Sequence, residues 1–491
     1  MKKEIVQLIK HSGIYGIGVA LSKSVGFFMI PVYTRYLVPR DYGILELLDV
    51  VLFASTTFAA MGVFGAIFRF YAAYESEDDK KEVIGTALIF TVGTSILISL
   101  GLVYWAPIIA DIYLGDASLA QCVRIVGCTF FFTNMSEVPM AYWRAQGRTV
   151  LFVSLGLGRT IMAALNLVVF LVILKMGILG ALYANLLTNS IWGLALCGVV
   201  LASIPWRIKR DKLEKMLNYG IPTVAWSVGG FILTFSDRIF LRYYASLSEV
   251  GVYALGYKMA RIVPIVITGP FNMAWQWQQF ELAKRENARQ IIARVGSYLL
   301  MAATMVCLGI SVLAKDILRI MVPASYWGAA AVVPLIAASY LLFNLQLVVI
   351  SGIYIQRVTS RLAVVAAATA GLNLALNYLL IPQFHIMGAA VATWLSYAGQ
   401  LALSFVAAQS CYHVPYQYKR NAIILGSATF IYFVSTLPTL DISVSVVFNL
   451  ILVAAFSGIC YLLLEAREKQ IVQQWMLSAH TGLRRVWLQA R

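Results

Sequence analysis

The sequence predicts an all-α integral membrane protein with about fourteen transmembrane helices, arranged as two six-helix lobes followed by two more helices. Three observations lead to this fold class. Of the 491 residues, 60% are hydrophobic and 12% are charged, against about 25% charged in an average soluble protein. Basic residues gather in alternate connections between apolar stretches, and several short motifs recur at an offset of 207 or 208 residues.

This composition excludes a soluble enzyme and any sizeable domain outside the membrane. At about 20 residues per span, fourteen spans use about 280 residues and leave about 14 for each connection or tail. The formal net charge is +16, which in a soluble protein would suggest nucleic acid as a partner. Because the basic residues lie between spans, we expect no nucleic-acid partner. The six cysteines show neither a CxxC pair nor metal-site spacing, and we expect no metal or cofactor.

The first six predicted spans form an N-terminal lobe, residues 1–206. The first span follows Lys2, Lys3 and Lys10 and is longer than the apolar core of a signal peptide, so we expect it to be retained. The six spans cover 13–36, 42–68, 84–107, 118–142, 150–174 and 178–204.

A charged cytoplasmic linker, 207–216, leads into a C-terminal lobe of six spans, 217–411, and a segment with two further spans, 412–465. The tail, 466–491, is basic and carries apolar residues; a helix on an anionic membrane surface and a solvated tail both remain open. The eight spans cover 217–243, 250–276, 291–313, 328–353, 359–381, 386–409, 421–437 and 443–464.

The distribution of basic residues predicts the orientation. With both termini on the inner side, the inner segments hold 26 Lys and Arg residues and the outer segments hold 6. By the positive-inside rule, both termini face the cytoplasm.

An internal repeat relates the two lobes. Arg35-Tyr36 recurs as Arg242-Tyr243, and Asn166-Leu167 recurs as Asn373-Leu374, both shifted by 207 residues. Gly180-Ala181 recurs as Gly388-Ala389, shifted by 208. Since the offset spans an even number of helices, the lobes have the same orientation in the membrane and are related by an axis along the membrane normal.

Charged residues inside spans are the candidates for function, because each is costly in hydrocarbon and needs a partner or a water-filled cavity. Glu137 and Arg159 lie at similar depths on adjacent helices, and we expect a structural ion pair within the first lobe. Arg124 is close enough to a span end to extend to the interface.

The other charges lie on the first helical hairpin of each lobe. Lys23, Arg238, Lys258 and Arg261 form a predicted series of cations between the lobes, suited to an anionic head group. Glu46, Asp49 and Asp237 are the predicted gate, in which Glu46 or Asp49 meets Lys258 as a breakable ion pair near the outer mouth. The alternative is that all these charges pair permanently along the seam between the lobes.

Two groups of motifs resemble a known family. Ser236-Asp237-Arg238-Ile239-Phe240-Leu241, then Glu249-Val250-Gly251-Val252-Tyr253 and Tyr257-Lys258, are similar to the start of the second lobe in bacterial polysaccharide transporters. Tyr15-Gly16, Pro31, Thr34-Arg35-Tyr36-Leu37 and Asp41-Tyr42-Gly43 resemble the start of the first lobe. These transporters are the Wzx-like flippases of lipid-linked oligosaccharides in the multidrug/oligosaccharidyl-lipid/polysaccharide (MOP) exporter superfamily.

The resemblance implies a V-shaped, two-lobed flippase rather than an enzyme, which carries an undecaprenyl-diphosphate-linked oligosaccharide from the inner to the outer leaflet by alternating access. In the family, basic side chains hold the diphosphate; Arg238 and Lys258 lie within the matched motif, and Lys23 and Arg261 are added by their depth.

The resemblance also implies a multi-pass protein of the bacterial cytoplasmic membrane that works in cell-surface polysaccharide synthesis. Membrane lipids, a polysaccharide polymerase and glycosyltransferases are the candidate partners. Two alternatives remain. One is a cation-coupled multidrug exporter of the same superfamily, which the acidic residues Glu46, Asp49 and Asp237 favour. The other is a membrane polymerase or ligase of lipid-linked sugars.

Overall fold

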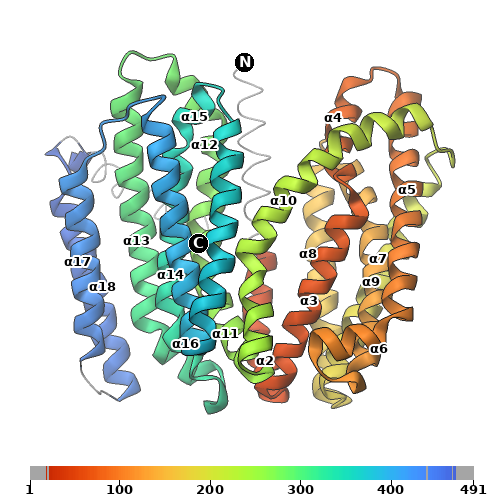
Figure 1. Cartoon of the computed structure of the whole chain (residues 1–491), viewed down its shortest axis with the longest axis horizontal. Coiled ribbons are helices and arrows are strands. Elements are labelled where there is room, and N and C mark those ends of the chain that lie inside the picture. Colours follow the sequence, from red (N-terminus) through yellow and green to blue (C-terminus); the bar gives the residue numbers. More distant parts are fainter. Residues whose placement is uncertain (1–17, 19–20, 438–440, 467, 471–491) are drawn as a thin grey trace, which may run out of the picture.

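The computed structural model describes residue 18 and residues 21–437, 441–466 and 468–470, and every regular element among them is a helix. The helices form two bundles that stand side by side (Figure 1). The predicted all-α class and two-lobed arrangement are confirmed. The start of the first predicted span and the tail from residue 471 lie outside the described residues.

The N-terminal bundle begins with helical residues 21–28, which lead into α2 (Ile30–Tyr36). Its second predicted span is broken into α3 (Pro39–Ala60) and α4 (Val63–Ala73) at Met61 and Gly62, which both have positive φ, 44° and 74°. The remaining elements are α5 (Glu77–Tyr104), α6 (Ala106–Ile109), η1 (Ala110–Leu114), η2 (Ala117–Leu119), α7 (Ala120–Ala145), α8 (Thr149–Leu167), η3 (Val168–Ile173) and α9 (Gly177–Leu201).

The C-terminal bundle contains one unusually long helix, α16 (Ser360–Gln409), which covers two predicted spans and is interrupted at His385 (φ 53°, ψ −126°). The break marks the turn expected between these spans. The bundle's other elements are α11 (Leu247–Ala260), η4 (Pro264–Thr268), α12 (Gly269–Ala283), α13 (Ala288–Met321), η5 (Ala324–Tyr326), α14 (Ala329–Val349) and α15 (Ser351–Ile355).

Helix α10 (Arg210–Tyr244) crosses obliquely from one bundle to the other (Figure 1). Its first turn is fixed to the N-terminal bundle, because the buried Lys212 ammonium donates to Asp79 at 2.6 Å and to Glu82 at 2.7 Å on α5. Its last turns pack against α11 and α16. The two halves of α10 are inclined by 42° around residues 224–227. The connection between the bundles is therefore itself a structural element of both.

The bundles share one hydrophobic core at one end and have separate cores at the other. In the shared core, Leu47 and Leu48 of α3 pack with Val250 and Tyr253 of α11. Toward the other end, the N-terminal bundle has its own core around Ile67, whereas other cores fill the C-terminal bundle. We call these the closed end and the split end; they are the lower and upper ends in Figure 1.

The last two helices, α17 (Tyr418–Thr436) and α18 (Ile442–Leu462), pack against each other and against α13. Near the closed end, the buried Asp316 of α13 accepts hydrogen bonds from Ser445 and Asn449 of α18 at 2.9 and 3.0 Å. Near the split end, Glu468 accepts a hydrogen bond from Arg420 at 3.0 Å. Polar contacts thus fasten this pair of helices at both ends.

By length and apolarity, nine helices of the described chain could cross a membrane, or ten if the bent α10 is counted as one span. This supports a multi-pass membrane protein, whereas the count of fourteen spans stays a prediction. One reason for the difference is that α16 is counted once although it covers two predicted spans.

Candidate functional site

Asp237 and Arg238 follow each other on α10 and are almost fully buried, with exposed fractions of 1% and 3%. The Arg238 guanidinium donates to the Asp237 carboxylate at 3.0 Å and to the Thr234 carbonyl at 2.7 Å. It also lies 4.5 Å from the ring centroid of Tyr257. Arg238 is therefore neutralised and desolvated within the protein, rather than presented to a ligand.

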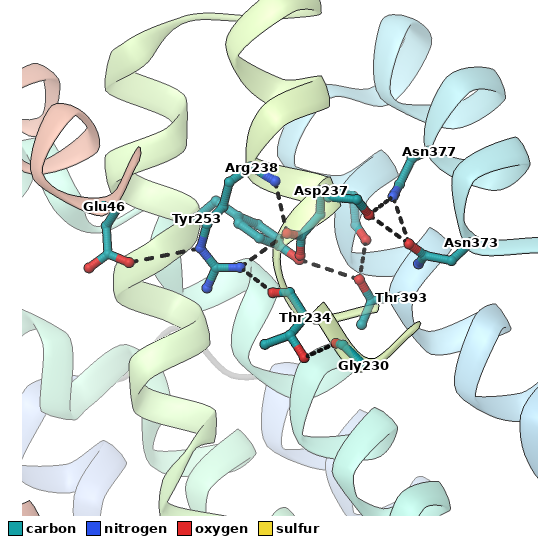
Figure 2. A network of polar contacts seen from close by, with 11 residues as sticks. Glu46, Gly230, Thr234, Asp237, Arg238, Tyr253, Asn373, Asn377 and Thr393 are labelled. Carbon is teal, nitrogen blue, oxygen red and sulfur yellow. Dashed lines mark hydrogen bonds and ion pairs between the residues drawn. The ribbon is translucent and has the colours of Figure 1, made fainter. Parts of the chain in front are cut away.

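Asp237 is the acidic member of a hydrogen-bond network inside the C-terminal bundle (Figure 2). The Tyr253 hydroxyl donates to its second carboxylate oxygen and lies 3.4 Å from the Thr393 hydroxyl. Beside it, the Ser236 hydroxyl donates to the Asn373 amide oxygen at 2.8 Å. All of these hydrogen-bond partners lie on α10, α11 and α16. Asp237 is therefore bound within the C-terminal bundle, and another acid makes the ion pair with a residue of the opposite bundle.

That acid is Glu46 on α3. Lys258 on α11 forms an ion pair with Glu46 and donates a hydrogen bond to the Tyr42 hydroxyl at 3.0 Å. Arg238 Nε lies 3.8 Å from the other Glu46 oxygen (Figure 2). Of the two acids predicted to meet Lys258, Glu46 and Asp49, Glu46 is the one in contact with it. One buried carboxylate therefore binds two cations of the other bundle.

Three predicted site residues differ from these buried or paired charges in having exposed side chains: Lys23, Asp49 and Arg261. Lys23 and Asp49 lie within electrostatic range of Arg261, although they belong to the opposite bundle. None of the three forms an ion pair within the part of the chain that the structure describes. The predicted series of four cations is thus divided: Arg238 and Lys258 are bound by internal acids, and Lys23 and Arg261 remain accessible.

Three further hydrogen bonds join the bundles at the closed end. Arg242 on α10 donates to the Leu114 carbonyl at 2.8 Å, and the neighbouring Tyr243 hydroxyl donates to the Ile112 carbonyl at 3.3 Å. From the other side, the Tyr326 hydroxyl donates to the Leu37 carbonyl at 2.9 Å. The acceptors are backbone carbonyls, which carry no sequence signal. In the sequence, Arg242-Tyr243 is recognisable only as a repeat of Arg35-Tyr36.

The expected ion pair between Glu137 and Arg159 is wrong. Arg159 instead donates a hydrogen bond to the Asn189 amide oxygen on α9. No ion pair of Glu137 within 4.0 Å occurs among the described residues, although the two charges remain within electrostatic range. Counting residues from the turn gave the right depth, but the guanidinium points toward α9 rather than α7.

The network around Asp237 offers carboxylate, hydroxyl and amide oxygens. No group of three or more His, Cys, Asp or Glu residues suited to a metal ion occurs in the described ranges. The arrangement can instead close one end of the molecule through ion pairs and hydrogen bonds, and present exposed cations beyond that closure.

Comparison with known families gives one match, to the family described as "Polysaccharide biosynthesis protein", over residues 32–331. This range contains α3, α10 and α11, and with them Glu46, Arg238, Lys258 and Arg261.

Among curated proteins, the chain is 24% identical over 248 residues to the probable low-salt glycan biosynthesis flippase Agl15 of Haloferax volcanii, covering 49% of this chain and 50% of that protein. It is 23% identical over 273 residues to Lsg locus putative protein 1 of Haemophilus influenzae, covering 53% and 63%. The chain thus spans from about half to somewhat under two thirds of the length of these relatives.

Among solved structures, the lipid II flippase MurJ in an inward closed conformation superposes with a TM-score of 0.75, at 11% identity, over 92% of this chain and 99% of that chain. An outward-facing multidrug resistance MATE transporter of the MOP superfamily superposes with a TM-score of 0.62, at 13% identity, over 82% and 95%. The predicted MOP-type fold is confirmed by these matches.

Proposed function

The chain belongs to the polysaccharide biosynthesis protein family, and from this premise we propose that it is a flippase for an oligosaccharide linked to undecaprenyl diphosphate. It moves this lipid from the cytoplasmic to the outer leaflet of a bacterial cytoplasmic membrane by alternating access and catalyses no chemical reaction. The observation that carries the proposal is the pair Lys23 and Arg261: two exposed cations from opposite bundles, beyond a sealed closed end.

The orientation follows from the basic connections. Arg144 and Arg148 flank one turn at the split end, and Lys284, Arg285 and Arg289 flank another. By the positive-inside rule, the split end faces the cytoplasm. In this proposed orientation the state is inward-facing and closed to the outside, and a lipid from the inner leaflet would bind at Lys23 and Arg261.

The chemistry of the substrate fits this division. A diphosphate is held well by charge-assisted hydrogen bonds from Lys and Arg, and Arg can bind two of its oxygens at once. The oligosaccharide is too polar to cross hydrocarbon unaided, whereas the polyprenyl chain can stay in the lipid. The internal pairs of Arg238 and Lys258 keep those cations from competing for the diphosphate while the closed end is shut.

A multidrug exporter is the second candidate, because Asp49 is an exposed carboxylate without an ion pair in the described chain. A cationic drug would bind Asp49 rather than Lys23 and Arg261. The MATE transporters have the same fold, so the fold does not distinguish the two functions.

The test is leaflet exchange in proteoliposomes with a synthetic undecaprenyl-diphosphate oligosaccharide. We expect protein-dependent exchange that falls about 10- to 100-fold in Arg261→Ala, since a charge-assisted hydrogen bond contributes about 1.5–3 kcal/mol. Lys315→Ala is the control, because Lys315 is an exposed cation on α13. No exchange by the folded protein, together with transport of a cationic dye that depends on Asp49, would favour the exporter instead.

A further inference from the structure

A cavity of about 140 Å³ lies in the N-terminal bundle between the first helix, α8 and α9. Its walls are mostly small and apolar, with polar groups contributed by Tyr33, Thr160 and Asn185. None of these three takes part in the ion pairs described above. The small residues of the wall are Gly26, Ala163, Ala164, Ala181 and Ala184.

Gly26 lines this cavity without a side chain. A Cβ built on Gly26 would meet no atom within 4 Å, and the residue has no positive φ. Neither close packing nor backbone conformation requires glycine here, in contrast to Gly62, whose Cβ would lie 2.3 Å from the Gly220 carbonyl. A larger side chain at position 26 would therefore extend into the free space beside it without a clash at its Cβ.

Two polar groups of the cavity are available to a ligand. The Thr160 hydroxyl is already bonded to the Gly156 carbonyl at 2.9 Å. The Asn185 amide and the Tyr33 hydroxyl make no side-chain hydrogen bond in the described part of the chain. An amide supplies both a donor and an acceptor, and a phenol can do either. The best ligand is thus a small group with its own donor and acceptor.

The cavity adjoins the charged groups at both of its ends. Gly26 is three residues from Lys23 and so lies on the same face of the first helix. Tyr33 packs edge to face on Tyr42, with 6.1 Å between ring centroids, and Tyr42 accepts a hydrogen bond from Lys258. The cavity thus begins about one helical turn along the chain from Lys23, near the place where a diphosphate bound by Lys23 and Arg261 would lie.

Resting on the proposed function, we propose that the cavity binds the acetamido group of the sugar residue attached directly to the diphosphate. The carbonyl and N–H of the acetamido group pair with Asn185, assisted by the Tyr33 hydroxyl, and its methyl group packs against the alanines. A cavity of roughly 150 Å³ holds benzene, so the space suits a sugar substituent rather than a sugar ring. The flippase thereby selects a 2-acetamido sugar at the lipid end of its oligosaccharide.

The test compares undecaprenyl-diphosphate-N-acetylglucosamine with undecaprenyl-diphosphate-glucose in the leaflet-exchange assay. The wild-type protein is expected to exchange the acetamido lipid about tenfold faster, the factor that one lost hydrogen bond gives. Asn185→Leu should abolish this preference and leave exchange of the glucose lipid intact. Gly26→Leu should slow the acetamido lipid selectively, and Gly458→Leu is its control, since a Cβ at Gly458 also meets nothing within 4 Å.

Equal exchange of both lipids by the wild-type protein, unchanged in Asn185→Leu, overturns the acetamido assignment and leaves the flippase proposal standing. Equal slowing of both lipids by Gly26→Leu also overturns it, because the cavity would then hold the isoprenoid part that both lipids share. The increase in Tm that each lipid gives in detergent is a readout independent of transport. If the folded protein exchanges neither lipid, the flippase proposal fails. Equal increases in Tm with the two lipids would separately overturn the acetamido assignment.

Discussion

Gly43 of α3 and Gly251 of α11 cross backbone to backbone at the closed end. A Cβ on Gly43 would lie 1.9 Å from the Leu247 carbonyl oxygen, and one on Gly251 would lie 2.1 Å from the Pro39 carbonyl oxygen. The two glycines are 208 residues apart, within one residue of the 207-residue shift that relates Arg35 to Arg242. The bundles therefore touch at equivalent points of equivalent helices, and this contact lies at the axis that relates them.

We expect Gly251→Ala to open the closed end. The added methyl group cannot be accommodated without moving the backbone of α3, and overpacking of this kind costs about 1–3 kcal/mol. That cost falls only on the state in which the helices touch, so the population of the opposite state should rise about 5- to 100-fold. Spin labels at positions 38 and 248 should report a longer distance between the bundles. Gly93→Ala is the control, because a Cβ there meets no atom within 4 Å, and it should leave that distance unchanged. An unchanged distance in Gly251→Ala would contradict this account of the closed end.

Exchanging the charges of Glu46 and Lys258 should restore part of the transport that each single reversal removes. Breaking a buried pair leaves an uncompensated charge and costs about 3–5 kcal/mol, whereas the double variant keeps a pair. The comparison is Asp49→Lys combined with Lys258→Asp, which we expect not to rescue, because Asp49 forms no ion pair in the described chain. Rescue by the Asp49 combination and not by the Glu46 combination would assign the closing pair to the other acid.

Arg242→Ala should loosen the closed end without altering the fold of either bundle. The variant loses a charge-assisted hydrogen bond to the Leu114 carbonyl, which contributes about 1.5–3 kcal/mol. A cysteine at position 248 should then react faster with a membrane-impermeant maleimide added outside. Arg35→Ala is a matched control, since Arg35 is the repeat equivalent of Arg242 and has an exposed side chain without an ion pair in the described chain. Equal labelling in wild type and Arg242→Ala would remove this residue from the closure.

Glu468 should make the attachment of α17 and α18 sensitive to acid. Burial raises its pKa, but hydrogen bonds from Tyr298, the Glu465 backbone and Arg420 outweigh this and hold the pKa below its ordinary value. An acid with a lowered pKa contributes stability above its unfolded pKa of about 4.3, and this contribution is lost as the pH falls through the folded value.

Glu468→Gln should therefore lower the Tm at pH 7, by the loss of about 1.5–3 kcal/mol of charged hydrogen bonding, and should have a smaller effect at pH 3.5. Glu465→Gln, which removes an exposed ion pair of 3.6 Å with Arg294, should change the Tm little at either pH. A Tm that falls equally at both pH values in Glu468→Gln would show that the carboxylate charge is not what holds the two helices.

The sequence predicted the fold because its signals are long and repeated: apolar runs, charge asymmetry and one offset along the chain. It also brought Lys258 and Glu46 together, since depth along paired helices can be counted in residues. Rotation about a helix axis cannot be counted in this way. Arg159 therefore turned out to face Asn189 instead of Glu137, and Arg238 to bind its own neighbour Asp237.

Other parts of the site had no sequence signal to find. Carbonyl acceptors such as that of Leu114 exist at every residue, and only the folded chain selects which of them receives Arg242. The exposed state of Lys23 and Arg261 likewise depends on how far the bundles stand apart. The cavity beside Gly26 is recognisable only when the space around a glycine is known.

For the flippase proposed above, the shared hydrophobic core at the closed end implies that the inward-facing and outward-facing states differ in energy. Leu47, Leu48 and Val250 lie in the core that both bundles share at this end, and each 100 Å² of this apolar surface that becomes exposed to water when the bundles separate costs about 2.5 kcal/mol. The empty protein should thus be mainly inward-facing, open to the cytoplasm. A bound lipid must then lower the energy of the outward-facing state relative to the inward-facing one. Such a difference in energy would favour transport in one direction, because the lipid would bind first from the cytoplasmic leaflet, to which the empty protein is open.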